Sequence, residues 1–497
     1  MRMATSLKSD TFYSFKSVDP THCHGSAHPK EHSNTVAFQV KDTADSENTV
    51  TVSEITTRHL RRLQQSASDY LGKQVSAAVI TVPTNFSDAQ KAALTEAAKA
   101  TNLEVLQFIH EPVSALLAYD ARPEAVIKDK IVVVADIGGT RTDVAVIASR
   151  GGMYTILATA HDYELGGASL DQVLIDYAAK EFMKKNKTDP RENERSLAKL
   201  KLEAEAVKKS LSIGTTAAFS IESLADGVDF SLTVNRTRYE LLANKVFGSF
   251  TRLIESAVKK AELDLLDVGE VILAGGTAHT PKIARNLQTA FPQRVNVLAP
   301  STSPTAINPS ELSARGAAIQ ASLIAEFDKE DIEQSTHAAV TVTPHLAKAV
   351  GISIVAETLG EEVFEPLIEA QTAVPVRRTA QIPAPKDGGD VLIRLVEGLN
   401  EIKVTKPEPK PKAETNGEDE DSDDDDDDDE EEEIREKLWK IGSPLAEAAI
   451  KGVKKGAKIE VQVNIGSDLT VQLSAREIGG KGGVRGGIEA GTVNGSA

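Results

Sequence analysis

Apolar residues are distributed in two different patterns along the chain. Up to about residue 328, unbroken runs of apolar and mostly β-branched residues occur, as at 131–134 and 271–274, and such runs are typical of strands buried on both faces of a sheet. Amphipathic or alanine-rich stretches separate these runs and predict helices, among them 51–71 and 193–212. Strands that alternate with helices in this way predict an α/β fold.

Beyond residue 328 the pattern changes to short segments in which apolar and polar residues alternate. These segments lie at 339–344, 350–355, 379–384, 390–398, 458–464 and 469–475. The alternation predicts an antiparallel sheet or sandwich, with one face of each strand turned to a core. A Pro/Lys segment and an acidic run interrupt it, and we expect the acidic run to stay disordered because its charges repel each other.

Glycine pairs follow two of the buried strands. Gly138 and Gly139 come shortly after Asp136, and Gly275 and Gly276 directly follow the strand at 271–274. Glycines let the backbone fold back with N–H groups free to face an anion, and a carboxylate beside them suits a phosphate with its metal ion. A simple β-hairpin turn is the commoner explanation of the first junction taken alone. The repeated junction favours two similar lobes that close on a nucleotide.

Glu111 and a third glycine pair stand at the starts of two predicted helices. Glu111, with Pro112, follows the predicted strand at 103–109, where either ligand chemistry or the helix dipole explains an acidic residue. Gly166 and Gly167 precede the next long helix, as an anion site or as a plain structural turn. The sequence alone leaves both alternatives open.

Later helices carry further polar positions. In the helix over 193–212, one face holds Glu205, Lys208 and Ser212, which periodicity alone describes as a solvated surface. Thr237 and Glu240 predict the cap of another long helix. A helix over 310–327 is expected to close the second lobe.

The composition narrows the class of protein. With 497 residues, 40% of them hydrophobic, the chain is long enough for about three domains with a substantial core. The net charge of −18 comes largely from 418–433, where fifteen of sixteen residues are acidic, so the rest is nearly neutral. This argues against a globally basic nucleic-acid binder and leaves local basic patches open. The single cysteine, Cys23, fits a reducing compartment. Without an apolar segment of membrane-spanning or signal-peptide length, we expect a cytoplasmic protein.

Three polar regions carry weaker signals. An N-terminal group has the donor types of a zinc site, although nearby Pro and Gly residues favour a loop without metal: His22, Cys23, His24, His28 and His32. The tail sequence GGKGGVRGG lacks the Ser or Thr of a phosphate loop and holds one Arg-Gly-Gly unit for RNA contact. The acidic run is interpreted as a solubilising spacer, with docking to basic surfaces as the alternative.

Six segments carry a family resemblance through their order. They are AVITVPTNFSDAQKAAL, FIHEPVSALLAY, DIGGTRTDVAVI, ELGGASLD, VILAGGTAHTPKI and ARGAAIQA, spread over residues 77–321. Together they resemble the nucleotide-binding domain of the heat-shock protein 70 chaperones, and 340–404 with 458–475 resembles that family's peptide-binding β-sandwich. The resemblance implies an α/β fold with an actin-like, two-lobed nucleotide-binding domain, N-terminally incomplete, followed by a truncated antiparallel β-sandwich.

The resemblance also implies ATP and Mg²⁺ as cofactors, and it gives roles to single residues. Glu111 and Asp136 are the candidates for contact with Mg²⁺ and water, without a metal cage made of protein alone. The implied nucleotide-binding residues are Asp136, Gly138, Gly139, Thr140, Gly166 and Gly167 around the phosphates and Glu205, Lys208, Ser212, Gly275, Gly276, Thr277 and His279 around the adenosine. His279 stands where the family usually has an arginine that stacks on the base.

The sequence departs from the family pattern at several places. Thr140 and Arg141 stand where the family has a third glycine and a threonine, so a bulky cation replaces a hydroxyl near the γ-phosphate. The family's first phosphate loop and its phosphate-reaching lysine are expected upstream of Met1. The linker IEQSTHAAV is polar, and no long helical lid is expected after Arg476.

These departures resemble the fungal ribosome-associated-complex type of the family. That resemblance implies a chaperone subunit that binds ATP with little or no hydrolysis and pairs with a J-domain partner of the zuotin type at the ribosome. The pair would act on nascent chains by stimulating a second, active heat-shock protein 70, without membrane or DNA partners. The alternative is an active ATP-hydrolysing foldase with a mis-annotated N-terminus. A small-molecule kinase on the actin-like fold is disfavoured by the appended sandwich.

The chain therefore divides into six predicted parts. They are a polar, loop-rich remnant of the first lobe at 1–48, the nucleotide-binding domain at 49–328, a linker at 329–339, a sandwich at 340–404 and 456–476, a disordered Pro/Lys and acidic insertion at 405–437 and a Gly-rich tail at 477–497. Efficient enzymatic turnover is not expected from this arrangement.

Overall fold

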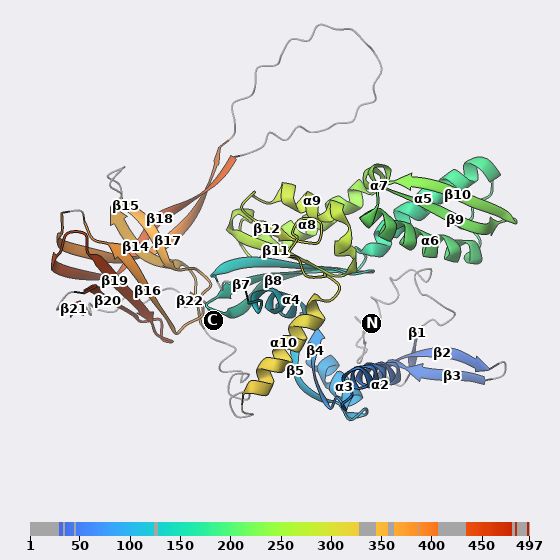
Figure 1. The fold of residues 1–497 in the computed structure, drawn as a ribbon, viewed down its shortest axis with the longest axis horizontal. Coiled ribbons are helices and arrows are strands. Elements are labelled where there is room, and N and C mark those ends of the chain that lie inside the picture. Colours follow the sequence, from blue (N-terminus) through green and yellow to red (C-terminus); the bar gives the residue numbers. More distant parts are fainter. Residues whose placement is uncertain are drawn as a thin grey trace, which may run out of the picture.

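A computed structural model provides the structure of the chain. It describes residues 29–32, 35–43, 46–123, 128–327, 344–355, 362–385, 387–405, 434–479, 483–484 and 495–496. The predicted linker, the acidic run and the side chains of the N-terminal histidine and cysteine group lie outside this description. Figure 1 shows a central sheet with helices above and below it, a smaller unit beneath, and a group of long strands at one side.

A mixed five-stranded sheet forms the centre of the larger domain. Its order is β12-β11-β6-β7-β8, made of β6 (Lys130–Ile137), β7 (Thr142–Arg150), β8 (Met153–Asp162), β11 (Val268–Ala274) and β12 (Asn296–Leu298). β6, β11 and β12 run parallel to one another. β7 is antiparallel to β6, and β8 is antiparallel to β7. Val132 and Val133 are both fully buried although successive side chains point to opposite faces. The predicted strand covered on both faces is confirmed.

Helices cover both faces of this sheet. On one face lie α8 (Asn244–Lys260) and α9 (Pro281–Ala290). The same hydrophobic core continues beyond the sheet into α5 (Gly167–Asn186) and α6 (Glu194–Ile213), which pack against each other, and α6 packs against the hairpin β9 (Thr216–Ala225) and β10 (Val228–Asn235) (Figure 1). The opposite face packs against α4 (Glu111–Asp120) and α10 (Leu312–Glu326). Among the helices of the described ranges, none is both long and apolar enough to cross a membrane.

The predicted cap at Thr237 and Glu240 is wrong. Both residues lie inside α7 (Arg236–Leu242), whose N-cap is Asn235, with a side chain that accepts a hydrogen bond from Arg238 N. Ala243 then separates α7 from α8, so the predicted single long helix is two helices. An Asn side chain caps a free helix amide as well as a Thr side chain does. Residue type alone therefore does not decide whether Asn235 or Thr237 is the N-cap.

A smaller α/β unit lies below the central sheet in Figure 1. Its parallel strands β4 (Ala77–Val82) and β5 (Glu104–His110) pack against α2 (Val52–Leu71) and α3 (Asp88–Lys99). The helix predicted to close the second lobe is α10, but it packs against α4 and contacts β4 and β5. α10 therefore joins the two units instead of belonging to one lobe.

The N-terminal described residues form a small antiparallel sheet. Its order is β1-β2-β3, with β1 (Pro29–His32), β2 (Thr35–Thr43) and β3 (Ser46–Thr51). The loop-rich remnant predicted for 1–48 is wrong for these described residues. The alternation of Val36, Phe38 and Val40 with other residues in β2 is a strand pattern that the prediction overlooked, and pairing with β2 orders the more polar β1 and β3.

Two four-stranded antiparallel sheets form the C-terminal sandwich, as predicted. One has the order β15-β14-β17-β18 and the other β16-β19-β20-β21. Their bounds are β14 (Ala349–Val355), β15 (Glu362–Ile368), β16 (Val376–Pro383), β17 (Gly389–Thr405), β18 (Ile434–Val453), β19 (Lys458–Ile465), β20 (Val471–Glu477) and β21 (Gly483–Val484). A further short pair joins β13 (His345–Leu346) to β22 (Gly495–Ser496). Alternate residues of β19 fill the core between the sheets.

The disordered insertion predicted for 405–437 extends too far. β18 begins at Ile434 and pairs with the end of β17, where Thr405 lies opposite Ile434 and Lys403 opposite Glu436. The residues after the acidic run are rich in charge, so their own pattern favours disorder. Pairing along the long neighbouring strand orders them.

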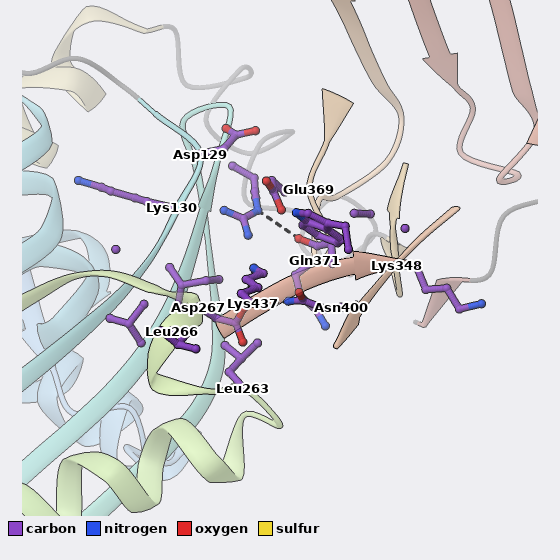
Figure 2. Close-up of a pocket in the computed structure, with 18 of the residues that line it drawn as sticks. Asp129, Lys130, Leu263, Leu266, Asp267, Lys348, Glu369, Gln371, Asn400 and Lys437 are labelled. Carbon is purple, nitrogen blue, oxygen red and sulfur yellow. Dashed lines mark hydrogen bonds and ion pairs between the residues drawn. The ribbon is translucent and has the colours of Figure 1, made fainter. Parts of the chain in front are cut away.

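Charged side chains connect the sandwich to the central domain. At the end of β7, Arg150 donates through Nε to Ala370 O at 3.1 Å. Lys437 of β18 lies 2.7 Å from Asp267 in the 3-10 turn η2 (Leu265–Asp267). These groups line a pocket of about 450 Å³ between the two parts, shown in Figure 2. The sandwich is thus held beside one edge of the central domain.

Candidate functional site

The loop between β6 and β7 connects several elements of the central domain. Gly138 N donates to Arg141 O at 2.9 Å and closes the turn. Gly138 O accepts from Gly167 N at 3.0 Å and from Thr277 Oγ1 at 2.9 Å. Gly166, the N-cap of α5, precedes Gly167, and Thr277 belongs to the 3-10 turn η3 (Gly276–His279). The structure therefore brings the three predicted glycine junctions together.

The glycines at these junctions allow a very close approach of backbones. A Cβ atom on Gly167 would lie 2.7 Å from Thr277 Oγ1. Gly275 has a φ of +85°, which L side chains rarely adopt, and its Cβ would lie 2.5 Å from Asp136 Oδ1. A larger residue at either position would fill the space where the junctions meet, which we call the glycine floor.

Gly139 and Thr140 form the open edge of the loop. Both residues are exposed, and a Cβ on Gly139 would meet open space. Within the described part of the chain, their amide groups donate no hydrogen bond. Two neighbouring free N–H groups beside a buried strand end are suited to the oxygens of an anion such as phosphate.

The three polar residues predicted to share one face of α6 make different kinds of contact. Lys208 is buried, and its Nζ donates to the first carbonyl of α5 at 2.9 Å and to Asp171 Oδ2 at 2.8 Å. Ser212 Oγ donates to Lys208 O, and the exposed Glu205 lies 2.7 Å from Lys209. Lys208 thus braces the glycine floor, whereas Glu205 and Ser212 make contacts along their own helix. The sequence reasoning missed Asp171 as the partner of Lys208.

Gly276 and His279 lie at the exposed rim formed by η3. His279 Nε2 is 3.2 Å from Asn308 Oδ1 and 3.4 Å from Ser310 Oγ. These neighbours orient the imidazole ring at the edge of the cleft.

An acidic cluster surrounds Arg141 on the other side of the loop. Glu111 begins α4, Asp136 ends β6, and Asp143 lies directly across the strand pair from Asp136. Arg141 Nε is 2.5 Å from Asp143 Oδ2, and Arg141 Nη2 is 3.5 Å from Glu111 Oε2. His161 Nδ1 lies 2.8 Å from Asp143 Oδ1. The sequence reasoning identified Arg141 but missed Asp143 and His161, although the register of the hairpin predicts that Asp143 faces Asp136.

Burial changes the protonation of two carboxyl groups in this cluster. Burial and the neighbouring charge of Asp136 raise the pKa of Glu111 to about 7. Burial and the charge of Asp143 raise the pKa of Asp136 to about 6. Arg141 opposes both shifts, since a nearby cation favours the ionised carboxylate.

We expect the free energy of unfolding to fall as the pH rises from about 4 to about 7 because of these two groups. Their folded-state pKa values lie above the ordinary values of 4.5 and 3.8, so the folded chain binds more protons in this window. The stabilisation is complete below the ordinary values and is lost as the pH passes the raised values. Glu111→Gln, uncharged at every pH, should remove about 2 kcal/mol of the fall.

Urea unfolding at a series of pH values measures this effect. Glu96→Gln is the matched control, because Glu96 has a 72% exposed side chain and its charge meets water in both states. The control should keep the slope of the wild-type chain. A Glu111→Gln variant with an unchanged slope would contradict the assignment.

The donors around Arg141 do not suit a divalent cation. Mg²⁺ requires oxygen ligands in a nearly octahedral arrangement at about 2.1 Å. The guanidinium pairs with oxygens of both Glu111 and Asp143, and its charge repels a second cation. Among the described side chains, no group of three or more His, Cys, Asp or Glu could hold a metal ion. The glycine floor and the free amides, in contrast, fit a phosphate.

Comparison with known proteins places the chain in a family. The sequence model of the family described as "Hsp70 protein" matches residues 5–406. The ribosome-associated complex subunit SSZ1 of Saccharomyces cerevisiae is 44% identical over 93% of this chain and 84% of its own length. A heat shock protein 70 homologue of Schizosaccharomyces pombe is 42% identical over 93% of this chain and 80% of its own length.

A more distant relative is similar to a smaller share of the chain. Heat shock 70 kDa protein 14 of Danio rerio is 33% identical over 73% of this chain and 69% of its own length. The family match and the two parts of the structure confirm the predicted actin-like, two-lobed α/β fold followed by a β-sandwich. As the six ordered segments predicted, the chain belongs to the Hsp70 protein family.

Proposed function

We propose that the chain binds ATP in the cleft around the loop 138–141 and hydrolyses it little or not at all. The observation that carries the proposal is the meeting of three glycine junctions at this loop, where Gly139 and Thr140 offer unpaired amides. Proteins commonly bind phosphate groups on such loops. The proposed contacts are Asp136, Gly138, Gly139, Thr140, Gly166 and Gly167 for the phosphates and Glu205, Lys208, Ser212, Gly275, Gly276, Thr277 and His279 for the adenosine.

Weak hydrolysis is supported by the surroundings of Arg141. The arginine engages Glu111 and Asp143, two groups that would otherwise be available to order a metal ion or an attacking water. Any Mg²⁺ that accompanies ATP would be held by phosphate and water oxygens and not by Glu111 or Asp143, which Arg141 engages. ATP then acts as a lasting ligand that holds the two lobes together.

The proposed biological role is that of a chaperone subunit at the ribosome. It is supported by similarity along 93% of the chain to a yeast protein named as a ribosome-associated complex subunit. We propose that the chain works in the cytoplasm with a J-domain partner, contacts ribosomes and nascent chains through that complex, and stimulates a second, active heat-shock protein 70.

One observation favours a second candidate, an active ATP-hydrolysing foldase. The pKa of Glu111, raised to about 7, lies near the operating pH, which is where a general base is most effective. This candidate predicts steady release of phosphate by the purified chain, whereas the first predicts binding without turnover.

Equilibrium ATP binding and a single-turnover assay on the purified chain distinguish the two candidates. We expect binding with negligible hydrolysis, and co-sedimentation with ribosomes only when the J-domain partner is present. Thr140→Glu should abolish binding, because it places a carboxylate beside the free amides. The matched control Thr237→Glu, at an exposed position of α7, should bind normally. Substantial turnover would favour the foldase, and normal binding by Thr140→Glu would contradict the site.

A further inference from the structure

Arg141 lies at the centre of the acidic side chains in the cleft. Its Nε is 2.5 Å from Asp143 Oδ2, and its Nη2 is 3.5 Å from Glu111 Oε2. Asp136 faces Asp143 across the strand pair. The Arg141 side chain is only 17% exposed, so solvent screens these interactions little.

The backbone on both sides of Arg141 is fixed. The carbonyl of Arg141 accepts from Gly138 N at 2.9 Å, which closes the turn. The next residue, Thr142, is fully buried and donates through Oγ1 to Leu165 O at 2.8 Å. The Arg141 side chain, just before β7, reaches back to Asp143, the second residue of that strand. The arginine is therefore a built part of the cleft.

A nucleotide brings several negative charges to a place that already contains three carboxyl groups. In many phosphate sites, a divalent cation between carboxylates and phosphates neutralises this charge. Here a guanidinium stands between the carboxylates. Its remaining N–H groups, which do not face Asp143 or Glu111, are available to phosphate oxygens, and guanidinium geometry suits such acceptors.

We propose that Arg141 takes the place of the divalent cation in this cleft, so that the chain binds its nucleotide without Mg²⁺. The inference rests on the nucleotide binding proposed above and adds a separate claim, namely which positive charge faces the phosphates. It also accounts for weak turnover, because a guanidinium held by two ion pairs does not carry and activate water as a hydrated metal ion does.

Titration of a fluorescent ATP analogue into the purified full-length chain tests the inference, once with Mg²⁺ and once with EDTA. We expect the two dissociation constants to agree within about threefold. A weakening of about tenfold or more in EDTA would overturn the inference and leave the proposed function standing. Absence of binding in both buffers would overturn the proposed function and the inference together.

Arg141→Thr provides a measurement that does not depend on the nucleotide. The variant frees Glu111 and Asp143, so Mn²⁺, which prefers such oxygen ligands, should bind the nucleotide-free variant and raise its midpoint of thermal unfolding. The wild-type chain should show neither effect. Arg315→Thr is the matched control, because it removes an exposed arginine of α10 that pairs with Glu311. Like the wild-type chain, it should not bind Mn²⁺ or gain thermal stability from it.

A conservative variant covers the case in which the threonine variant does not fold. Arg141→Lys keeps a positive charge at the same place and should still bind the nucleotide in EDTA. Binding by Arg141→Lys that requires Mg²⁺ would overturn the inference. The inference would also be overturned if the wild-type chain bound Mn²⁺ and the Glu111→Gln variant did not.

Discussion

Replacing Gly275 with alanine should lower the free energy of unfolding by about 3 kcal/mol and abolish nucleotide binding. The φ of +85° at Gly275 alone costs an L residue about 1 to 2 kcal/mol. The new Cβ would also lie 2.3 Å from Ile137 O and 2.5 Å from Asp136 Oδ1. Both atoms belong to the end of β6, so β6 and β11 would have to separate where the phosphate loop begins.

Urea unfolding and ATP titration measure the two effects of Gly275→Ala. The neighbouring Gly276→Ala is a close control, because Gly276 has an ordinary φ and its Cβ would only touch Ser310 Oγ at 3.9 Å. Its free energy of unfolding should stay within about 0.5 kcal/mol of the wild-type value. If Gly275→Ala kept both its stability and its ATP binding, the junction would not be the floor of a nucleotide site.

Features that depend on near neighbours in the chain could be predicted from the sequence. The apolar run in β6 is buried on both faces, as its lack of polar alternation indicated. Ser87 and Gln90 have the three-residue spacing from which the sequence predicts a capping box, and they form it at α3 with both reciprocal hydrogen bonds present. In each case the stabilising contacts join residues at most three positions apart or follow a simple periodicity, so the local pattern contains the necessary information.

Features that depend on pairing between strands were missed. β18 begins in a charged sequence that pairs with the end of β17, and β1 and β3 are polar strands ordered by pairing with β2. The helix α2 shows the same limit, because its amphipathic pattern places Leu60, Leu63 and Tyr70 near one predicted apolar stripe. Leu60 is buried, whereas Leu63 and Tyr70 are 53% and 90% exposed. Periodicity identified the helix but not how much of its apolar face other elements cover.

The chemistry of the cleft was predictable only in part for the same reason. The glycines and Asp136 are recognisable because each junction is a short continuous segment. The partners of Arg141 come from α4 and β7, and Lys208 of α6 reaches the start of α5. Such ion pairs depend on how the elements pack. In the sequence, Arg141 is only the replacement of a family hydroxyl. In the structure, Arg141 pairs with Glu111 and Asp143.

Gly316→Ala on α10 should lower the free energy of unfolding by about 3 to 5 kcal/mol. α10 passes α4 so closely that a Cβ on Gly316 would lie 1.8 Å from Ser114 O and 2.5 Å from Ser114 C. Ser114 is fully buried and donates through Oγ to Ser313 O at 2.7 Å. The backbones of two helices cannot yield as a flexible side chain does, so the variant must separate α4 from α10.

Because α4 also presents Glu111 to Arg141, this separation should weaken ATP binding together with stability. Gly248→Ala in α8 is the control, since its Cβ would meet only the flexible end of Arg252, at 3.2 Å. A glycine inside a helix costs about 0.5 to 1 kcal/mol relative to alanine, so Gly248→Ala should be as stable as the wild-type chain or more stable. Urea unfolding of both variants separates close helix packing from helix propensity. A Gly316→Ala variant that gained stability like the control would show that α4 and α10 are not in contact at Ser114, and the link between the two units would then have to lie elsewhere.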